Sequence, residues 1–132
     1  MIKNEMNRIG REQMQQLLKS IPSNYLTMEL NGEELQTWEQ YSLAIEKNMC
    51  FPTTCVNSID RYNDWIRDLE WLDAKGYVIV IYNFAKFMER NLIIKDIIIN
   101  GFKDFILPWW EGEVEKCTPC GKITPFNVYL VD

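Results

Sequence analysis

The chain has 132 residues, of which 47% are hydrophobic and 13% aromatic, a composition that suits one domain with a packed core and excludes a disordered chain. No run approaches the roughly 18 apolar residues of a membrane span, and the polar N-terminus lacks a signal-peptide core, so we expect a cytoplasmic protein that does not bind membranes. The net charge is −5, but ten basic and seventeen acidic residues follow position 24, a charge of −7 that disfavours nucleic acid as a partner.

The first part of the chain predicts a helix followed by a strand. Residues 7–21 form the pattern of an amphipathic helix, with an apolar side made of Met14, Leu17, Leu18 and Ile21. Residues 25–30 alternate between apolar and polar side chains before an Asn-Gly turn signal, which predicts a strand. We therefore expect an N-terminal helical extension over residues 1–24 and one domain over residues 25–132.

Two helices are predicted in the middle of the chain. Thr37 opens a capping-box pattern, and the apolar stripe behind it predicts a helix that runs to about Asn48. After a prolyl loop, Asn57 or Ser58 caps a second helix, whose apolar stripe continues to Leu72.

The C-terminal half predicts a buried strand, two helical segments, a loop and a closing strand. The apolar run YVIVIY at residues 77–82 is typical of a strand covered on both faces. Residues 84–89 and 94–107 are helical by pattern, and Pro108 is expected to stop or kink the second helix. Two glycines and two prolines indicate a long loop over residues 109–125, and residues 126–131 alternate as a strand.

The order of these elements predicts an α/β fold. Strands that are separated by helices are joined by crossovers, which makes the strands parallel and packs the helices on the sheet. We expect a small three-stranded parallel sheet packed with helices, together with the N-terminal amphipathic helix.

Three aspartates follow one another at four-residue intervals in the second middle helix. Asp60, Asp64 and Asp68 then share one helix face, although like charges at this spacing cost roughly 0.2 to 0.5 kcal/mol per pair. Such an acidic ridge suits a cationic partner. The alternative is an ordinary solvated face on which Arg61 and Arg67 neutralise Asp64.

The four cysteines form two closely spaced pairs. The segment CTPCGK, with Cys117 and Cys120, resembles one half of a zinc ribbon, and Cys50 and Cys55 would have to supply the other half. A redox dithiol and uninvolved thiols are the alternatives. A structural zinc would make the chain a zinc-stabilised regulatory or adaptor module.

An enzyme is disfavoured by the composition. Histidine is absent, which removes the usual general base, the commonest metal ligand and any Ser-His or Cys-His pair. A magnesium-dependent hydrolase built on Asp60, Asp64 and Asp68 is also disfavoured, because three residues of one straight helix do not surround an octahedral ion easily.

Three segments carry a resemblance to a known family: MELNGEEL at residues 28–35, FPTTCVNSIDRYNDWIRDL at residues 51–69 and VIVIYNFAKF at residues 78–87. Through them the chain resembles the barstar-like family of immunity proteins, which are intracellular bacterial inhibitors of secreted ribonucleases. The resemblance extends over residues 25–132 and implies the barstar-like α/β fold.

The resemblance also implies a function. In the family, the loop after the proline and the first turns of the next helix block the active site of the ribonuclease, and Asp60 and Asp64 fall on two aspartates that bind its basic residues. The implied partner is a cognate basic toxin, a ribonuclease, in a 1:1 complex that needs no cofactor. The partner-binding residues would be Thr54, Asn57, Asp60, Asp64 and Asp68. Thr54, Cys55 and Val56 replace two tyrosines and a glycine of the best-known member, which favours a different toxin.

Overall fold

The computed structural model describes residues 2–132 and has an α/β fold. The strands are β1 (Met6–Ile9), β2 (Tyr25–Asn31), β3 (Gly76–Tyr82) and β4 (Phe126–Val131). The α-helices are α1 (Arg11–Ser20), α2 (Trp38–Asn48), α3 (Ile59–Ile66), α4 (Leu92–Gly101) and α5 (Val114–Cys117). Shorter 3-10 turns are η1 (Gly32–Glu34) and η2 (Phe84–Lys86), and π-helical turns are η3 (Phe102–Ile106) and η4 (Trp109–Glu113).

The sheet has four parallel strands in the order β1-β4-β3-β2, and not the three that the sequence predicts. The additional strand is β1, which pairs with β4 from Met6 opposite Val128 to Ile9 opposite Val131. The sequence interpretation assigned residues 7–9 to a helix, because the two central side chains of this edge strand are polar and exposed and give no strand pattern. The helix that follows, α1, begins at Arg11.

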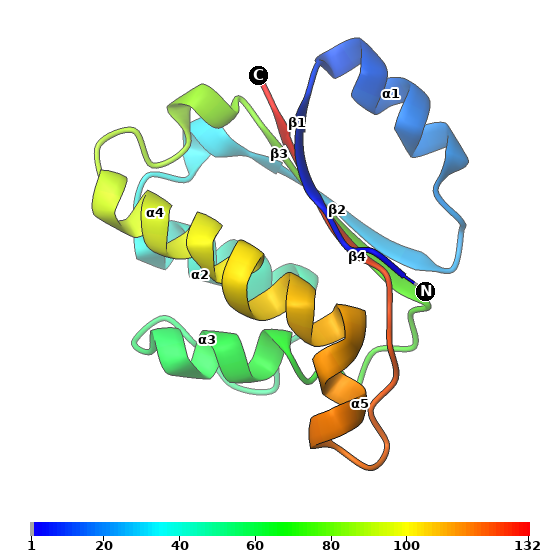
Figure 1. Ribbon diagram of the computed structural model, residues 1–132. Coiled ribbons are helices and arrows are strands. Elements are labelled where there is room, and N and C mark those ends of the chain that lie inside the picture. Colours follow the sequence, from blue (N-terminus) through cyan, green and yellow to red (C-terminus); the bar gives the residue numbers. More distant parts are fainter. Residues whose placement is uncertain (1) are drawn as a thin grey trace.

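The helices cover the two faces of the sheet unequally (Figure 1). Helix α1 lies on one face, and the other helices lie on the opposite face. The strand β3 is buried between these layers, as its apolar run predicts. Successive side chains of β3 point to opposite faces of the sheet. Ile79 and Ile81 enter the larger core under α2, α3 and α4, whereas Val78 and Val80 pack with Met14 of α1.

Helix α4 continues through η3 and η4 into α5, so that of the two outcomes predicted at Pro108, a stop or a kink, the stop is wrong. Leu107, Pro108 and Val114 all have right-handed helical backbone angles. The helical ribbon bends in this region without ending (Figure 1). The wider π-helical turns on either side of Pro108 are a common way to accommodate a residue that cannot make the regular helical hydrogen bond. The predicted loop over residues 109–125 therefore begins only after Cys117.

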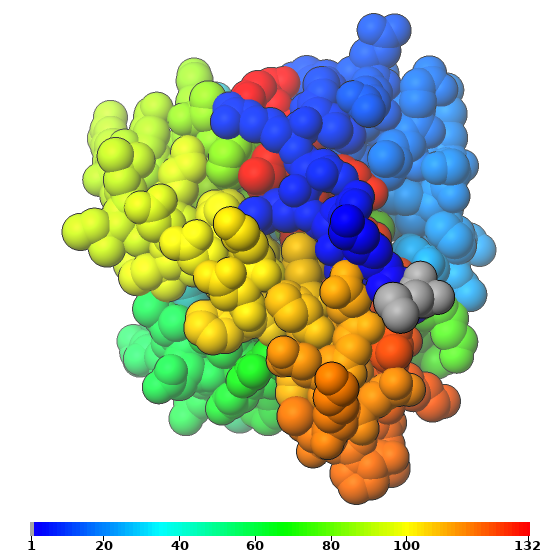
Figure 2. Space-filling model, in the orientation of Figure 1, coloured from blue at the N-terminus to red at the C-terminus, as the bar shows by residue number. Residues whose placement is uncertain are grey.

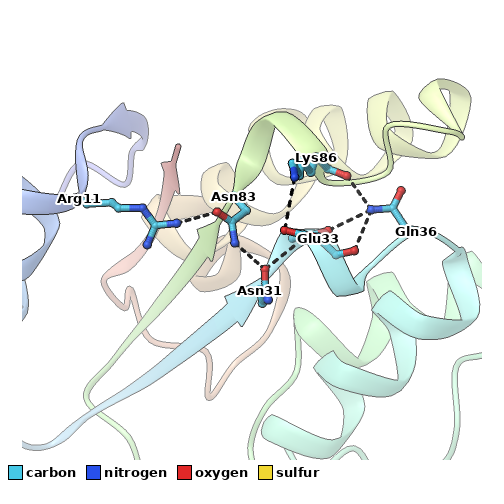
Figure 3. A network of polar contacts seen from close by, with 7 residues as sticks. Arg11, Asn31, Glu33, Gln36, Asn83 and Lys86 are labelled. Atoms are coloured by element: carbon cyan, nitrogen blue, oxygen red, sulfur yellow. Dashed lines mark hydrogen bonds and ion pairs between the residues drawn. The ribbon is translucent and has the colours of Figure 1, made fainter.

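The carboxyl ends of β2 and β3 are joined by a polar network (Figure 3). The Asn83 side-chain amide donates to the side-chain oxygen of Asn31 at 2.8 Å, and Arg11 donates to the side-chain oxygen of Asn83 at 2.6 Å. Gln36 donates to the main-chain carbonyl of Lys86 at 2.6 Å. These contacts hold the segment that leads into α2 against the sheet.

Within residues 2–132, no helix has both the length and the apolar character that are needed to cross a membrane.

Candidate functional site

Helix α3 presents two carboxylates on its outer side. Ser58 is the cap residue, because its hydroxyl accepts a hydrogen bond from the Arg61 main-chain N–H at 3.0 Å. Asp60 then lies in the first turn, where a negative charge is favourable, and Asp64 lies one turn later. Both residues are exposed, and 75% of the Asp64 side chain is accessible to solvent. We call Asp60 and Asp64 the acidic face.

The inner side of α3 is fixed by aromatic contacts. Tyr62 and Ile66 are buried, and the Tyr62 hydroxyl lies 2.6 Å from the Tyr41 hydroxyl of α2. The Trp38 ring packs edge-on against Tyr62, with the ring centres 5.2 Å apart. The helix therefore cannot roll without breaking buried contacts, and the acidic face has a defined direction.

The two arginines neighbouring Asp64 do not both neutralise it. Arg67 is 3.9 Å from the Asp64 carboxylate, and it also lies over the Trp109 ring at 5.2 Å. Arg61 turns away from Asp64 and donates to the main-chain carbonyl of Thr54 at 3.5 Å. Among residues 2–132, no salt bridge involves Asp60. Ion pairs among residues 2–132 thus neutralise the acidic face only weakly.

The loop over residues 51–57 is held in place by side-chain hydrogen bonds. The Trp38 indole donates to the Val56 carbonyl at 2.8 Å, and the Trp65 indole donates to the Thr53 hydroxyl at 3.0 Å. The Thr54 hydroxyl donates to Glu46 of α2 at 2.8 Å. Thr54 and Asn57 are exposed beside the start of α3, so this loop extends the surface around Asp60.

Asp60 and Asp64 lie together, but Asp68 does not continue their ridge. Helix α3 ends at Ile66, and Leu69 adopts a left-handed backbone conformation with φ of 53°. The carbonyls of Ile66 and Arg67 accept hydrogen bonds at 3.0 Å and 2.7 Å from the indoles of Trp110 and Trp109, respectively. Two tryptophans from a distant segment therefore satisfy this helix end, and the sequence offered no local signal for that.

Two open hollows adjoin the acidic face. One, of about 500 Å³, is lined by Asp60, Asn63, Asp64, Arg67 and Phe105. The other, of about 490 Å³, is lined by Trp38, Val56, Asn57, Ser58, Ile59, Asp60 and Ile94. Asp68 instead borders a third hollow on the far side of the helix end, between Arg67 and the loop after α5. The sequence analysis did not assign Trp38, Ile94 or Phe105 to the site.

The cysteines do not assemble a metal centre. Among residues 2–132, no three cysteine, histidine or acidic side chains are placed to hold an ion together. Cys50, Cys117 and Cys120 are exposed, whereas Cys55 is buried, with its sulfur 4.0 Å from the Ser42 carbonyl oxygen. Burial, reinforced by the charge of Glu46, raises the pKa of Cys55 to about 11, so this thiol is protonated in neutral solution. The arrangement gives no support to the zinc-ribbon hypothesis.

Comparison with known proteins identifies a family. The model of the family described as "Barstar (barnase inhibitor)" matches residues 25–116, from the first residue of β2 into α5. The match includes the 51–57 loop, the acidic face and both hollows beside it. Neither the curated proteins nor the solved structures give a match.

Proposed function

Because the chain belongs to the barstar family, we propose that it is an immunity protein that binds a basic toxin, a ribonuclease, in a 1:1 complex and blocks its active site. The observation that carries the proposal is the acidic face: two exposed carboxylates one turn apart, on a helix whose opposite side is locked to the core. Turnover and a cofactor have no part in this function.

The acidic face would imitate the phosphates of RNA. A ribonuclease holds its substrate with arginine and lysine side chains, and a carboxylate makes charge-assisted hydrogen bonds to the same groups, about twice as strong as neutral ones. Asp64 would lose little free energy on exchanging its contact with Arg67 for a contact with a partner, because the contact with Arg67 is long and exposed. Within residues 2–132, Asp60 has no such contact to lose.

The 51–57 loop would form the second part of the inhibitory surface. Thr54 and Asn57 stand beside Asp60, and the loop is already fixed by the Trp38 and Trp65 indoles. A loop that is ordered before binding loses less conformational entropy in the complex, and this favours affinity. We leave Asp68 out of the proposed surface, because it borders a different hollow.

The test is inhibition of two ribonucleases: barnase, which the family description names, and the product of the adjoining reading frame where that product carries a basic nuclease domain. We expect stoichiometric inhibition of one of them in an RNA-cleavage assay. Asp64→Asn should then weaken inhibition by about 10- to 100-fold, as loss of a hydrogen-bonded charge does.

Glu12→Gln is the matched control, because it removes one negative charge from α1 on the opposite face of the sheet. It should change inhibition less than about twofold, since it alters only the long-range field. Equal inhibition by the two variants would contradict the role of the acidic face, and failure to inhibit either ribonuclease would overturn the proposed function.

A further inference from the structure

Large apolar side chains are exposed along one helical segment. Ile93 and Ile97 of α4 are 75% and 40% exposed, and Phe105 of η3 is 56% exposed. We call these three residues the apolar strip. Leu92, at the start of the same helix, is 63% exposed. Four exposed large apolar residues on one segment are unusual enough to indicate contact with another protein.

The π-helical turn brings Phe105 closer to the line of Ile93 and Ile97. Ile93 and Ile97 are one turn apart, but in a regular α-helix Phe105 would be rotated by about 80° from Ile97, because each residue advances by about 100°. The wider π-helical turn of η3, which includes Phe105, reduces that offset. Such turns are frequently found at functional sites.

The Phe105 end of the apolar strip adjoins the acidic face. Phe105 lines the same hollow as Asp60 and Asp64, and Ile94, next to Ile93, lines the hollow on the other side of Asp60. Figure 2 shows the surface of α3, in green, and that of α4 and η3, in yellow to gold, meeting on one face of the molecule. A partner seated on the acidic face would therefore also reach Phe105, and a partner that extends along α4 would cover the rest of the apolar strip.

We propose that the apolar strip binds the same ribonuclease, at an apolar patch beside its basic cleft, and determines which ribonuclease is inhibited. This inference rests on the proposed function. Segment 92–106 carries two basic and two acidic residues, so the charge of the combined surface comes from α3. A second copy of this chain would bring its own acidic face toward Asp60 and Asp64, and like charges disfavour that pairing. A basic partner does not meet this repulsion.

The two halves of the surface would have different roles. Any basic nuclease is attracted by the acidic face, and that attraction weakens with salt. Contact with the apolar strip is not screened by salt and depends on a matching apolar shape. Discrimination among ribonucleases of similar charge would therefore depend on the apolar strip.

The test compares an Ile93→Gln/Phe105→Gln double variant with Leu43→Gln, which changes an apolar residue of α2 that is 46% exposed and borders neither hollow. Asp64→Asn reports on the proposed function. Dissociation constants for barnase and for the neighbouring nuclease are measured at about 50 mM and about 500 mM salt, where screening differs strongly. Sedimentation of the chain alone gives its oligomeric state, and circular dichroism verifies that each variant is folded.

We expect the double variant to bind at least about 10-fold more weakly at both salt concentrations, and the effect of Asp64→Asn to be smaller at the higher one. Leu43→Gln should bind like the parent chain. A double variant within about twofold of the parent, with Asp64→Asn still weakened, would overturn the inference and leave the proposed function standing. A dimer of the chain that the double variant dissociates would also overturn it. If Asp64→Asn binds normally, or neither nuclease binds, both proposals fail.

Discussion

The hydroxyl groups of Tyr41 and Tyr62 lie 2.6 Å apart and form a buried hydrogen bond between α2 and α3, directly behind the acidic face. Burial raises the pKa of both phenols well above the usual value, so both stay protonated in neutral solution and the bond persists. The orientation of the acidic face thus depends on a polar contact inside an otherwise apolar core.

Tyr62→Phe should destabilise the chain by about 1 to 3 kcal/mol, because it leaves the Tyr41 hydroxyl buried without a partner. Urea unfolding followed by tryptophan fluorescence measures this. The double variant Tyr41→Phe/Tyr62→Phe is the control, since it removes both polar groups. Its loss of stability should be smaller than the sum of the single losses, and simple additivity would show that the two hydroxyls are not coupled.

Gly32→Ala should also destabilise the fold. A Cβ atom on Gly32 would lie 2.7 Å from the carbonyl oxygen of Tyr82 and 2.9 Å from that of Asn83, so the junction between β2 and β3 would have to shift. We expect a loss of about 1 to 3 kcal/mol by thermal or urea unfolding.

Gly112→Ala is the matched comparison for Gly32→Ala. Gly112 lies in the helical segment after Pro108, and nothing is within 4 Å of its added Cβ. Alanine should be neutral there or stabilise the helix by up to about 1 kcal/mol. Similar losses at the two positions would contradict the close approach at Gly32.

The sequence predicts those elements of this fold that carry a hydrophobic pattern within their own segment. The apolar run of β3 and the alternation of β2 and β4 predict three of the strands, because side-chain periodicity reports burial directly. Edge strand β1 exposes Asn7 and Arg8 and gives no such signal. Its place in the sheet depends on pairing with β4, more than a hundred residues away.

At the candidate site, too, the sequence predicts the local features but not those that depend on distant segments. The capping residue Ser58 and the spacing of Asp60 and Asp64 are visible in the sequence, and the structure has them as predicted. The end of α3 before Asp68 is not visible, because the indoles of Trp109 and Trp110 cap it from a distant segment. Phe105 reaches the site by a π-helical turn, which a regular helical period does not anticipate.

The four thiols should differ in reactivity. At about pH 8, Cys50, Cys117 and Cys120 should react readily with a thiol reagent, because they are exposed. Cys55 should react only on unfolding, because it is buried and its pKa is raised to about 11. Ellman titration counts the reactive thiols, and we expect three in the native protein and four in the denatured protein. Protection of all four thiols that is lost in chelator would instead support a zinc site.

The same burial predicts a loss of stability in alkali. The pKa of Cys55 is about 11 in the folded chain and near its usual 9.0 in the unfolded chain. The contribution of this thiol to the free energy of unfolding is therefore fully present below pH 9.0. Between that pH and about 11, the unfolded state releases the proton first and stability falls. Urea midpoints measured across this range should therefore decline, and less so in Cys55→Ala. An identical slope in both proteins would contradict the assignment to Cys55.

Trp38→Phe should loosen the 51–57 loop with only a modest loss of global stability. The substitution keeps an aromatic ring against Tyr62 but removes the 2.8 Å hydrogen bond to the Val56 carbonyl. Hydrogen exchange of the main-chain amides around Val56 should become faster, and ribonuclease binding should weaken by about 10-fold, because a mobile loop must be ordered on binding.

Trp109→Phe is the control for Trp38→Phe, since it removes a comparable indole-to-carbonyl bond, of 2.7 Å, at the opposite end of α3. It should speed exchange near Arg67 and leave the 51–57 loop unchanged. If exchange around Val56 were the same in the parent and in Trp38→Phe, the indole would not be what orders the loop. Weakened binding without faster exchange would instead indicate that Trp38 itself contacts the partner, which its position in the hollow beside Asp60 permits.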